Sequence, residues 1–239
     1  MAERLPTPCA DAAAPEPKVQ VTAWVLAGGE GLRMGGVDKG LQPWRGQPLA
    51  QWVLEALRTQ ADKLGVGANR NQANYAQLLQ RACQASVKSL EPSASGPGNA
   101  GVHPDSPELP PRSGPLAGIL TALQHCPSDW LQLAACDTPN LPVHLVERLL
   151  AAARHAGADI AVPRTEEPGE DALEERLHWT CALIHKRVTP DLAAAFVKGE
   201  RKVGQWIRSQ RWVAVSFAPA CDFENMNTLE TLEAADERR

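Results

Sequence analysis

The segment between Leu26 and Gly40 combines many glycines with two basic residues, Arg33 and Lys39. Glycine lets the backbone adopt positive φ and approach a ligand closely, so several N–H groups can converge on one anion. The two cations would add charge to such a site. This pattern predicts phosphate binding, and an ordinary tight turn between a strand and a helix is the alternative. The glycines concerned are Gly28, Gly29, Gly31, Gly35 and Gly36.

This glycine-rich segment matches neither of the two common nucleotide-binding fingerprints. Met34 occupies the place of the third glycine in a dinucleotide motif, and Asp38 precedes Lys39 where a P-loop requires glycine. The pattern therefore disfavours a dinucleotide and a P-loop site, and the net charge of −4 suits a mononucleotide better than a nucleic acid polymer.

Asp137 is the second candidate for chemistry, because it directly follows the apolar run 130–136 and precedes the turn signal Thr138-Pro139. A nucleoside triphosphate is normally handled as its Mg²⁺ complex, which needs at least one carboxylate oxygen as a ligand. Asp137 is the best-placed carboxylate for this metal. Alternatively, it caps the following helix or pairs with a nearby base.

Two further segments have alternative interpretations. Asn225 to Thr228 either caps the last helix or offers amides to phosphate or to a second substrate. Gly114 to Gly118 either begins a helix or forms a loop whose backbone contacts a base.

Hydrophobic periodicity predicts strands that alternate with helices, and hence an α/β fold with a mainly parallel sheet covered on both faces. In such sheets ligands bind beyond the carboxyl ends of the strands, where both the glycine-rich segment and Asp137 fall. The acidic stretch 166–176 is expected to be a solvated loop. The predicted strands are 19–27, 64–68, 130–136, 159–163, 178–184 and 212–217, and the predicted helices are 49–57, 72–84, 116–123, 142–156, 189–198 and 228–235.

The length of 239 residues and the 44% hydrophobic content favour one α/β domain. Residues 1–18 are rich in proline and alanine and are expected to form a flexible leader, followed by a single domain over 19–239. Residues 91–101 are poor in apolar side chains and rich in Pro, Gly and Ser, which predicts a mobile surface insertion.

A net charge of −4 gives no basic field for a nucleic acid polymer. No apolar run approaches the length of a membrane span and no secretion signal is apparent, so we expect a cytoplasmic protein without membrane contact. The six cysteines lack Cys-x-x-Cys spacing and are expected to be buried, reduced thiols, and the histidines show no metal-ligand spacing.

The motifs together resemble the MobA family of molybdenum cofactor guanylyltransferases, and the likeness runs in order from about Val19 to the last predicted helix. The continuation Gly-Gly-x-Asp-Lys-Gly makes the match specific, whereas Leu-Ala-Gly-Gly alone is shared by many nucleotidyltransferases. The matching motifs are 26–40, Gly114-Pro-Leu-Ala-Gly118, Cys136-Asp-Thr-Pro139 and Asn225-x-Asn227-Thr228.

The resemblance implies a three-layer, Rossmann-like nucleotidyltransferase fold and a reaction between GTP and molybdopterin. The molybdopterin phosphate attacks the α-phosphorus of GTP, pyrophosphate leaves, and molybdopterin guanine dinucleotide forms with the help of Mg²⁺. Molybdoenzyme apoproteins and cofactor chaperones are further candidate partners. Such a transfer requires mainly positioning and charge stabilisation.

The resemblance also implies roles for individual residues, all of which fall in the motifs above or shortly before the second of them. Lys39 would bind the phosphates of GTP, Arg33 would neutralise the pyrophosphate, and Asp137 would hold the metal. The backbone of Leu26, Ala27, Gly28 and Gly29 would contact GTP, Asp105 is the best match for a GTP-contacting aspartate, and Asn225 and Asn227 would lie toward the pterin.

The chain departs from the family at Gly67, where an asparagine is common and a contact to the nucleotide would be lost. Three other functions stay open. A molybdopterin cytidylyltransferase would share the glycine-rich segment and Asp137, a sugar-1-phosphate nucleotidyltransferase has little room for a sugar domain, and a non-catalytic carrier would not need Arg33, Lys39 and Asp137 together.

Overall fold

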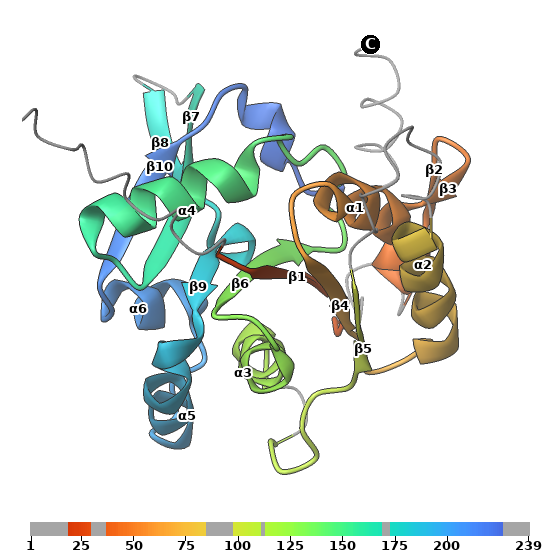
Figure 1. Ribbon diagram of the computed structural model, residues 1–239, viewed down its shortest axis with the longest axis horizontal. Helices are drawn as coiled ribbons and strands as arrows, with labels where there is room; N and C mark the ends of the chain where they lie inside the picture. The colour runs from red at the N-terminus through yellow and green to blue at the C-terminus, as the bar shows by residue number, and fades with distance from the viewer. Residues whose placement is uncertain (1–18, 30–36, 85–97, 111–112, 169–172, 227–239) are drawn as a thin grey trace, which may run out of the picture.

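The computed structural model describes residues 19–29, 37–84, 98–110, 113–168 and 173–226. A central sheet lies between two layers of helices (Figure 1), which confirms the predicted three-layer α/β fold. The strand order is β10–β7–β9–β6–β1–β4–β5, with β8 beside β7. The strands are β1 Val21–Leu26, β4 Lys63–Gly67, β5 Gly98–His103, β6 Trp130–Ala135, β7 Ile160–Pro168, β8 Leu173–Leu177, β9 Leu183–His185 and β10 Trp212–Ser216.

The half of the sheet formed by β5, β4, β1 and β6 is parallel throughout. Strand β9 runs antiparallel to β6 and β7, and β10 is parallel to β7. The central strand β1 is covered on both faces, so nearly all of it is apolar: Val21, Ala23 and Val25 face one core and Trp24 faces the other. The first described strand thus lies in the interior of the sheet, between β6 and β4.

Each face of the sheet has its own layer of helices. Helices α1, α2 and α4 cover the face of Val25, while α3, α5 and α6 cover the face of Trp24 (Figure 1). The short β2–β3 hairpin precedes α1 and lies outside the main sheet. The bounds are β2 Pro43–Trp44, β3 Gln47–Pro48, α1 Leu49–Arg58, α2 Gln72–Gln84, α3 Pro115–His125, α4 Leu145–Ala156, α5 Thr189–Val197 and α6 Val203–Arg208.

The prediction of a loop over 166–176 is wrong on the described residues. Strands β7 and β8 pair there as an antiparallel hairpin, on the side of β7 that faces β9 and away from β10. Arg176 pairs with Glu167 at 3.1 Å, and Arg164 pairs with Glu175. These cross-strand ion pairs let a highly charged segment form strands.

The prediction of a mobile insertion over 91–101 is wrong for residues 98–101, which belong to β5. Residues 91–97 lie outside the described part of the chain. Among the strands that the structure describes, β5 is the edge of the sheet and pairs only with β4, through a register shift between Leu64 and Gly65. Most of its residues, such as Gly98 and Asn99, have low β propensity, so the backbone pairing with β4 is what holds this strand.

The strand predicted over 178–184 begins later than expected. Residues Trp179–Cys181 form a 3-10 turn, and only Leu183–His185 pair as β9. The helix predicted over 228–235 and the leader 1–18 lie outside the described residues.

Cys126 and Cys181 are buried free thiols, as predicted, whereas Cys83 and Cys136 are only partly buried. Burial raises the pKa of Cys181 to about 12, so this thiol stays protonated at neutral pH. Cys9 and the side chain of Cys221 lie outside the described residues. Within the described ranges, no helix has the length and apolarity needed to cross a membrane.

His178 is buried against the ring of Phe223, with ring centroids 4.5 Å apart, and its Nε2 lies 2.8 Å from Thr165 Oγ1. Burial, aided by the charge of Arg176 and opposed by that of Glu167, lowers the pKa of His178 to about 4. Between pH 6.5 and 4 the unfolded chain therefore binds a proton that the native protein does not, so the stability contributed by neutral His178 is lost as pH falls.

We therefore expect the difference in unfolding free energy between the native protein and His178→Gln to shrink as pH falls from 7 to 5, by at most about 1.4 kcal/mol for each pH unit. Urea unfolding of both proteins at several pH values measures this difference. A constant difference over that range would contradict a neutral, buried His178.

Candidate functional site

Three parallel strands end side by side at one edge of the sheet. The Ala27 N–H donates to Gly67 O at 2.7 Å, and the Cys136 N–H donates to Leu26 O at 3.1 Å. These bonds join the residues that follow β1, β4 and β6. The glycine-rich segment and Asp137 therefore emerge at the same edge, as predicted from the strand order.

Lys39 and Asp137 meet at this edge although they are far apart in the sequence. Lys39 begins a 3-10 turn, Lys39–Leu41, and its Nζ lies 3.5 Å from Asp137 Oδ2. The side chains are 25% and 12% exposed, so both reach solvent. The arrangement places one cation and one carboxylate where a charged ligand can contact both.

Asn225 and Met226 form hydrogen bonds with the two residues Asp137 and Thr138 that follow β6. The Met226 N–H donates to Asp137 O at 2.8 Å, and Thr138 Oγ1 donates to Asn225 Oδ1 at 2.9 Å. Asn225 thus lies beside Asp137, which brings a third predicted residue to the site. Arg33 and Asn227 lie outside the described residues.

Asn69 joins two predicted residues that come from different strands. Its Nδ2 donates to Gly28 O at 3.3 Å and to Asp105 Oδ2 at 2.9 Å, and its Oδ1 accepts from the Asp105 N–H at 2.8 Å. Asp105 therefore lies at the same edge as Gly28. The sequence analysis gave Asn69 no role, although its position just after a predicted strand was a usable signal.

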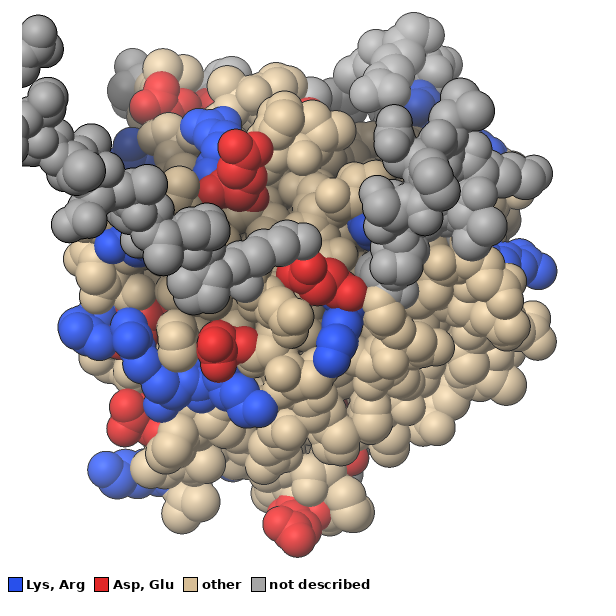
Figure 2. Space-filling view, viewed as in Figure 1, with Lys and Arg blue, Asp and Glu red and all other residues tan. Residues whose placement is uncertain are grey.

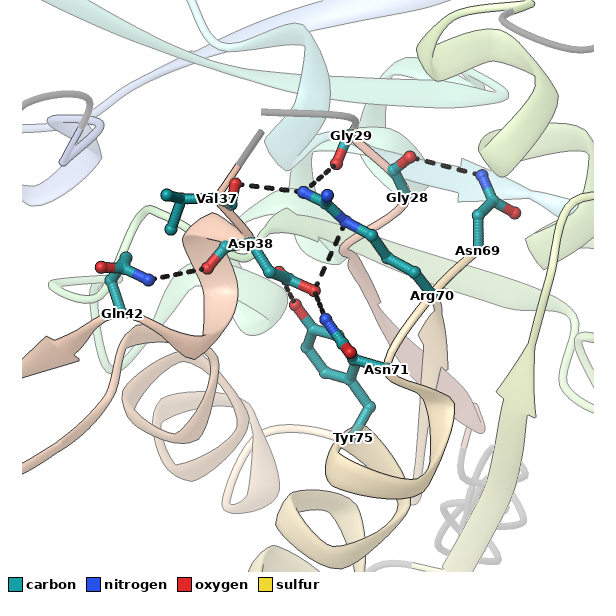
Figure 3. A network of polar contacts seen from close by, with 9 residues as sticks. All are labelled: Gly28, Gly29, Val37, Asp38, Gln42, Asn69, Arg70, Asn71 and Tyr75. Atoms are coloured by element: carbon teal, nitrogen blue, oxygen red, sulfur yellow. Dashed lines mark hydrogen bonds and ion pairs between the residues drawn. The ribbon is translucent and has the colours of Figure 1, made fainter. Parts of the chain in front are cut away.

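Asp38 is the buried carboxylate of the site, with a side chain only 8% exposed. It accepts hydrogen bonds from Tyr75 Oη at 2.5 Å and from Asn71 Nδ2 at 2.9 Å, and Arg70 Nε lies 3.8 Å away (Figure 3). Burial is the main reason that the pKa of Tyr75 is raised, with the charge of Cys136 and the bond to Asp38 adding to it. The sequence analysis missed this network, which links the residue before Lys39 to the start of α2.

Comparison with known proteins matches this arrangement to one family. A family model described as a MobA-like NTP transferase domain matches residues 23–215. The chain belongs to this family. The match runs from within β1 to within β10, so it includes part or all of every strand of the central sheet, which confirms the resemblance seen in the motifs.

MobA-like relatives cover nearly the whole chain. A protein of Ralstonia nicotianae named molybdenum cofactor guanylyltransferase is 37% identical and covers 93% of this chain and 99% of its own. A protein of the same name from Burkholderia vietnamiensis is 39% identical over 91% and 96%. The chain is thus a nucleotidyltransferase by family.

Solved structures share the fold. Molybdopterin-guanine dinucleotide biosynthesis protein A of Archaeoglobus fulgidus is 22% identical, with a TM-score of 0.62 over 90% of this chain and 97% of its own. The 4-diphosphocytidyl-2C-methyl-D-erythritolsynthase of Anaerococcus prevotii is 12% identical, with a TM-score of 0.64 over 91% and 95%. At these identities the likeness concerns the fold alone.

Gly67, where the resemblance to the family implies an asparagine, lies against Trp24. A Cβ at Gly67 would lie 2.9 Å from Trp24 Nε1, and one at Gly65 would lie 2.4 Å from Trp24 Cε3. Both distances are shorter than real Cβ contacts. The fully buried indole therefore fills the space beside β4 that side chains would need.

The motif Gly114–Gly118 begins α3, so the helix-entry interpretation is confirmed. The same residues also border the site. A Cβ at Gly118 would lie 3.4 Å from Leu26 Cδ2 and 3.6 Å from Asp105 Oδ1. The start of α3 thus forms one wall beside Asp105, which leaves base contact by this segment as a prediction.

Gly40 packs between Tyr75 of α2 and Cys136, which directly follows β6. A Cβ there would lie 2.5 Å from Tyr75 Oη and 3.1 Å from Cys136 Cβ. We expect Gly40→Ala to lower the unfolding free energy by about 1–3 kcal/mol, because the added methyl overpacks a filled space. Urea unfolding measures the loss.

Tyr75→Phe is the matched control for this packing effect, since it removes the hydroxyl nearest to the added methyl. The double variant is expected to lose less stability than the sum of the two single variants. Simple additivity would contradict the proposed clash.

The surface shows mixed charge on the face seen in Figure 2. Basic side chains gather toward the lower left, in the region of α6, with acidic side chains among them.

A metal ion at the site would not be held by protein ligands alone. Among the described residues, no group of three or more His, Cys, Asp and Glu side chains is arranged to hold a metal ion. A metal at Asp137 would therefore need other ligands, such as phosphate oxygens and water.

Proposed function

We propose that this protein transfers GMP from GTP to the phosphate of molybdopterin. A phosphate oxygen of molybdopterin attacks the α-phosphorus of GTP, and the bond from that phosphorus to the oxygen bridging to the β-phosphate breaks. The products are pyrophosphate and molybdopterin guanine dinucleotide. The curated relatives of this name, which cover more than nine-tenths of this chain, support this reaction.

The convergence of Lys39 and Asp137 at the carboxyl edge of β1 and β6 is the structural observation that carries the proposal. The Nζ to Oδ2 distance of 3.5 Å is short enough for one triphosphate to contact both side chains. Nucleotidyl transfer requires positive charge on the phosphates and a carboxylate near the metal that accompanies them. The edge supplies both, on Lys39 and Asp137.

The glycine-rich segment is proposed to bind GTP through its backbone. The Leu26 carbonyl and the Ala27 N–H are already used between strands, so these residues would contact GTP mainly by packing. The carbonyls of Gly28 and Gly29 accept from Asn69 and Arg70. We therefore assign phosphate contact to the N–H groups of Gly28 and Gly29, with Arg33 at the pyrophosphate.

A divalent metal fits this donor set, and we propose Mg²⁺. Mg²⁺ is commonly held by one or two carboxylates together with substrate phosphates and water, and Asp137 offers one partly exposed carboxylate. Bound there, the ion would stabilise charge on the triphosphate. Asp137 would orient the phosphates through it, while Lys39 neutralises them directly.

Asp105 and Asn225 are proposed to face the nucleoside and the pterin, respectively. Asp105, fixed by Asn69, would contact the nucleoside, and Asn225, fixed by Thr138, would lie toward the pterin together with Asn227. Recipient apoproteins and cofactor chaperones are proposed partners for the product. We propose the cytoplasm as the place of reaction.

The decisive experiment offers the purified protein molybdopterin, Mg²⁺ and each of the four nucleoside triphosphates in turn, and follows pyrophosphate release. We expect release with GTP. Release with CTP and none with GTP would replace the base assignment by a cytidylyltransferase. Release with none of the four would overturn transfer and favour a carrier.

A further inference from the structure

Arg70 contacts both residues that flank positions 30–36. Its Nη2 donates to Val37 O at 3.0 Å and to Gly29 O at 3.3 Å (Figure 3). Gly29 follows β1, and Val37 leads into Asp38 and Lys39. One guanidinium therefore joins the strand end to the segment that carries Lys39.

Asp38 forms an ion pair with the same guanidinium at its Nε atom. Its Oδ2 lies 3.8 Å from Arg70 Nε and accepts from Asn71, while its Oδ1 accepts from Tyr75. Asn71 has φ +52, a conformation that asparagine tolerates, and its carbonyl accepts from the Tyr75 N–H in the first turn of α2. The Asp38 carboxylate is therefore anchored to the start of α2 through Asn71 and the buried Tyr75.

The contacts of Asp38 with Arg70, Asn71 and Tyr75 also fix the backbone of Lys39, because Lys39 directly follows Asp38. The 3-10 turn from Lys39 is closed by hydrogen bonds from Leu41 N–H to Asp38 O at 3.2 Å and from Gln42 N–H to Lys39 O at 3.0 Å. Movement of Asp38 would change the distance between Lys39 and Asp137.

We propose that Arg70 is a positioning residue that sets Lys39 against Asp137 by joining Gly29 to Val37 and pairing with Asp38. Lysine could not reproduce this geometry, because only the planar guanidinium offers donors in a fixed fork. The inference rests on the proposed nucleotide transfer at this edge.

The first test is a double-mutant cycle between Arg70→Ala and Lys39→Ala, with pyrophosphate release from GTP as the measured rate. We expect Arg70→Ala alone to lower kcat/KM by up to about 10²-fold, as for a displaced catalytic group. When Lys39 is already alanine, Arg70→Ala is expected to lower kcat/KM less than about threefold, because the effect of Arg70 on the rate depends on Lys39.

Arg81→Ala is the matched control, since Arg81 is an exposed arginine on α2. It is expected to keep the native rate, while Arg70→Lys should recover only part of the loss. Equal rates for Arg70→Ala and Arg81→Ala would overturn the proposal. Equal losses from Arg70→Ala with and without Lys39 would also overturn it, because Arg70 would then act independently of Lys39.

The second test needs no activity. Hydrogen exchange of the Leu41 and Gln42 amides in the nucleotide-free protein is expected to quicken in Arg70→Ala and to stay native in Arg81→Ala. Unchanged exchange would overturn the positioning role. If Arg70→Ala does not fold, Arg70→Lys takes its place in both tests.

The two proposals fail in different ways. If the native protein releases no pyrophosphate with any nucleotide, the proposed function fails, and the exchange measurement still decides whether Arg70 holds the turn. If the native protein is active with GTP and Arg70→Ala is equally active, only the positioning role fails.

Discussion

Replacing Asp137 with asparagine is expected to lower the rate of pyrophosphate release from GTP by about 10²- to 10³-fold. Asparagine keeps the size of the side chain and removes the negative charge that lies 3.5 Å from Lys39. A cation accompanying the triphosphate would lose its carboxylate ligand, so the Mg²⁺ concentration for half-maximal rate should rise. Initial rates over a series of Mg²⁺ concentrations measure both effects.

Asp129→Asn is the matched control, because Asp129 is an exposed aspartate that precedes β6 at its opposite end. This variant is expected to keep the native rate. The fold should survive Asp137→Asn, since the Asp137 main-chain oxygen, not the carboxylate, accepts from Met226. A native rate in a folded Asp137→Asn protein would contradict the metal-binding role.

Replacing Lys39 with alanine is expected to lower kcat/KM for GTP by a similar factor. A unit charge 4 Å from a phosphate contributes about 4 kcal/mol at an effective dielectric constant of 20, and every 1.36 kcal/mol is about a factor of ten. Part of this is offset by solvent that replaces the ammonium group, which leaves about 10²- to 10³-fold. Steady-state kinetics with GTP varied and molybdopterin saturating measures the loss.

Lys198→Ala removes an exposed lysine just after α5 and serves as the control for net charge. It should leave the kinetics native. We expect Lys39→Ala to raise KM for GTP as well as to lower kcat, because Lys39 is proposed to bind phosphates both in the bound substrate and during transfer. A change in neither parameter would exclude Lys39 from the nucleotide site.

The sequence was sufficient to predict the central parallel strands β1, β4 and β6 and the edge of the sheet that carries the site. The run 19–27 is apolar on both faces, which is typical of a buried parallel strand, and it became β1 at the centre. Alternating strands and helices then placed the glycine-rich segment and Asp137 at the carboxyl ends. The contact between Lys39 and Asp137 follows from that topology.

The Asp38 network could not be predicted from the sequence. Tyr75 fits the apolar stripe of α2, and nothing local shows that its hydroxyl meets a carboxylate 37 positions earlier. Asp38 lies in the glycine-rich segment, and no local pattern shows that its side chain is nearly buried. Such pairs depend on how α2 packs against the turn at Lys39, which periodicity does not specify.

The wrong local predictions share one cause, since each concerns an element that tertiary contacts stabilise more than its own residues do. β5 is held by pairing with β4, and the β7–β8 hairpin by cross-strand ion pairs. The short helix α6 was not predicted at all, because six residues give too little periodicity to recognise. Burial of Val203, Trp206 and Ile207 against the sheet holds it in place.

The bonds from Asn225 and Met226 to the end of β6 have a consequence for the timing of synthesis. A ribosome completes β1, β4 and β6 long before it reaches these residues, so the nucleotide side of the site can assemble first. Asn225 and Met226, which are proposed to belong to the pterin side, follow only later. A chain that terminates before residue 225 is therefore expected to carry Lys39 and Asp137 without this segment, and to bind a nucleotide that it cannot pass on.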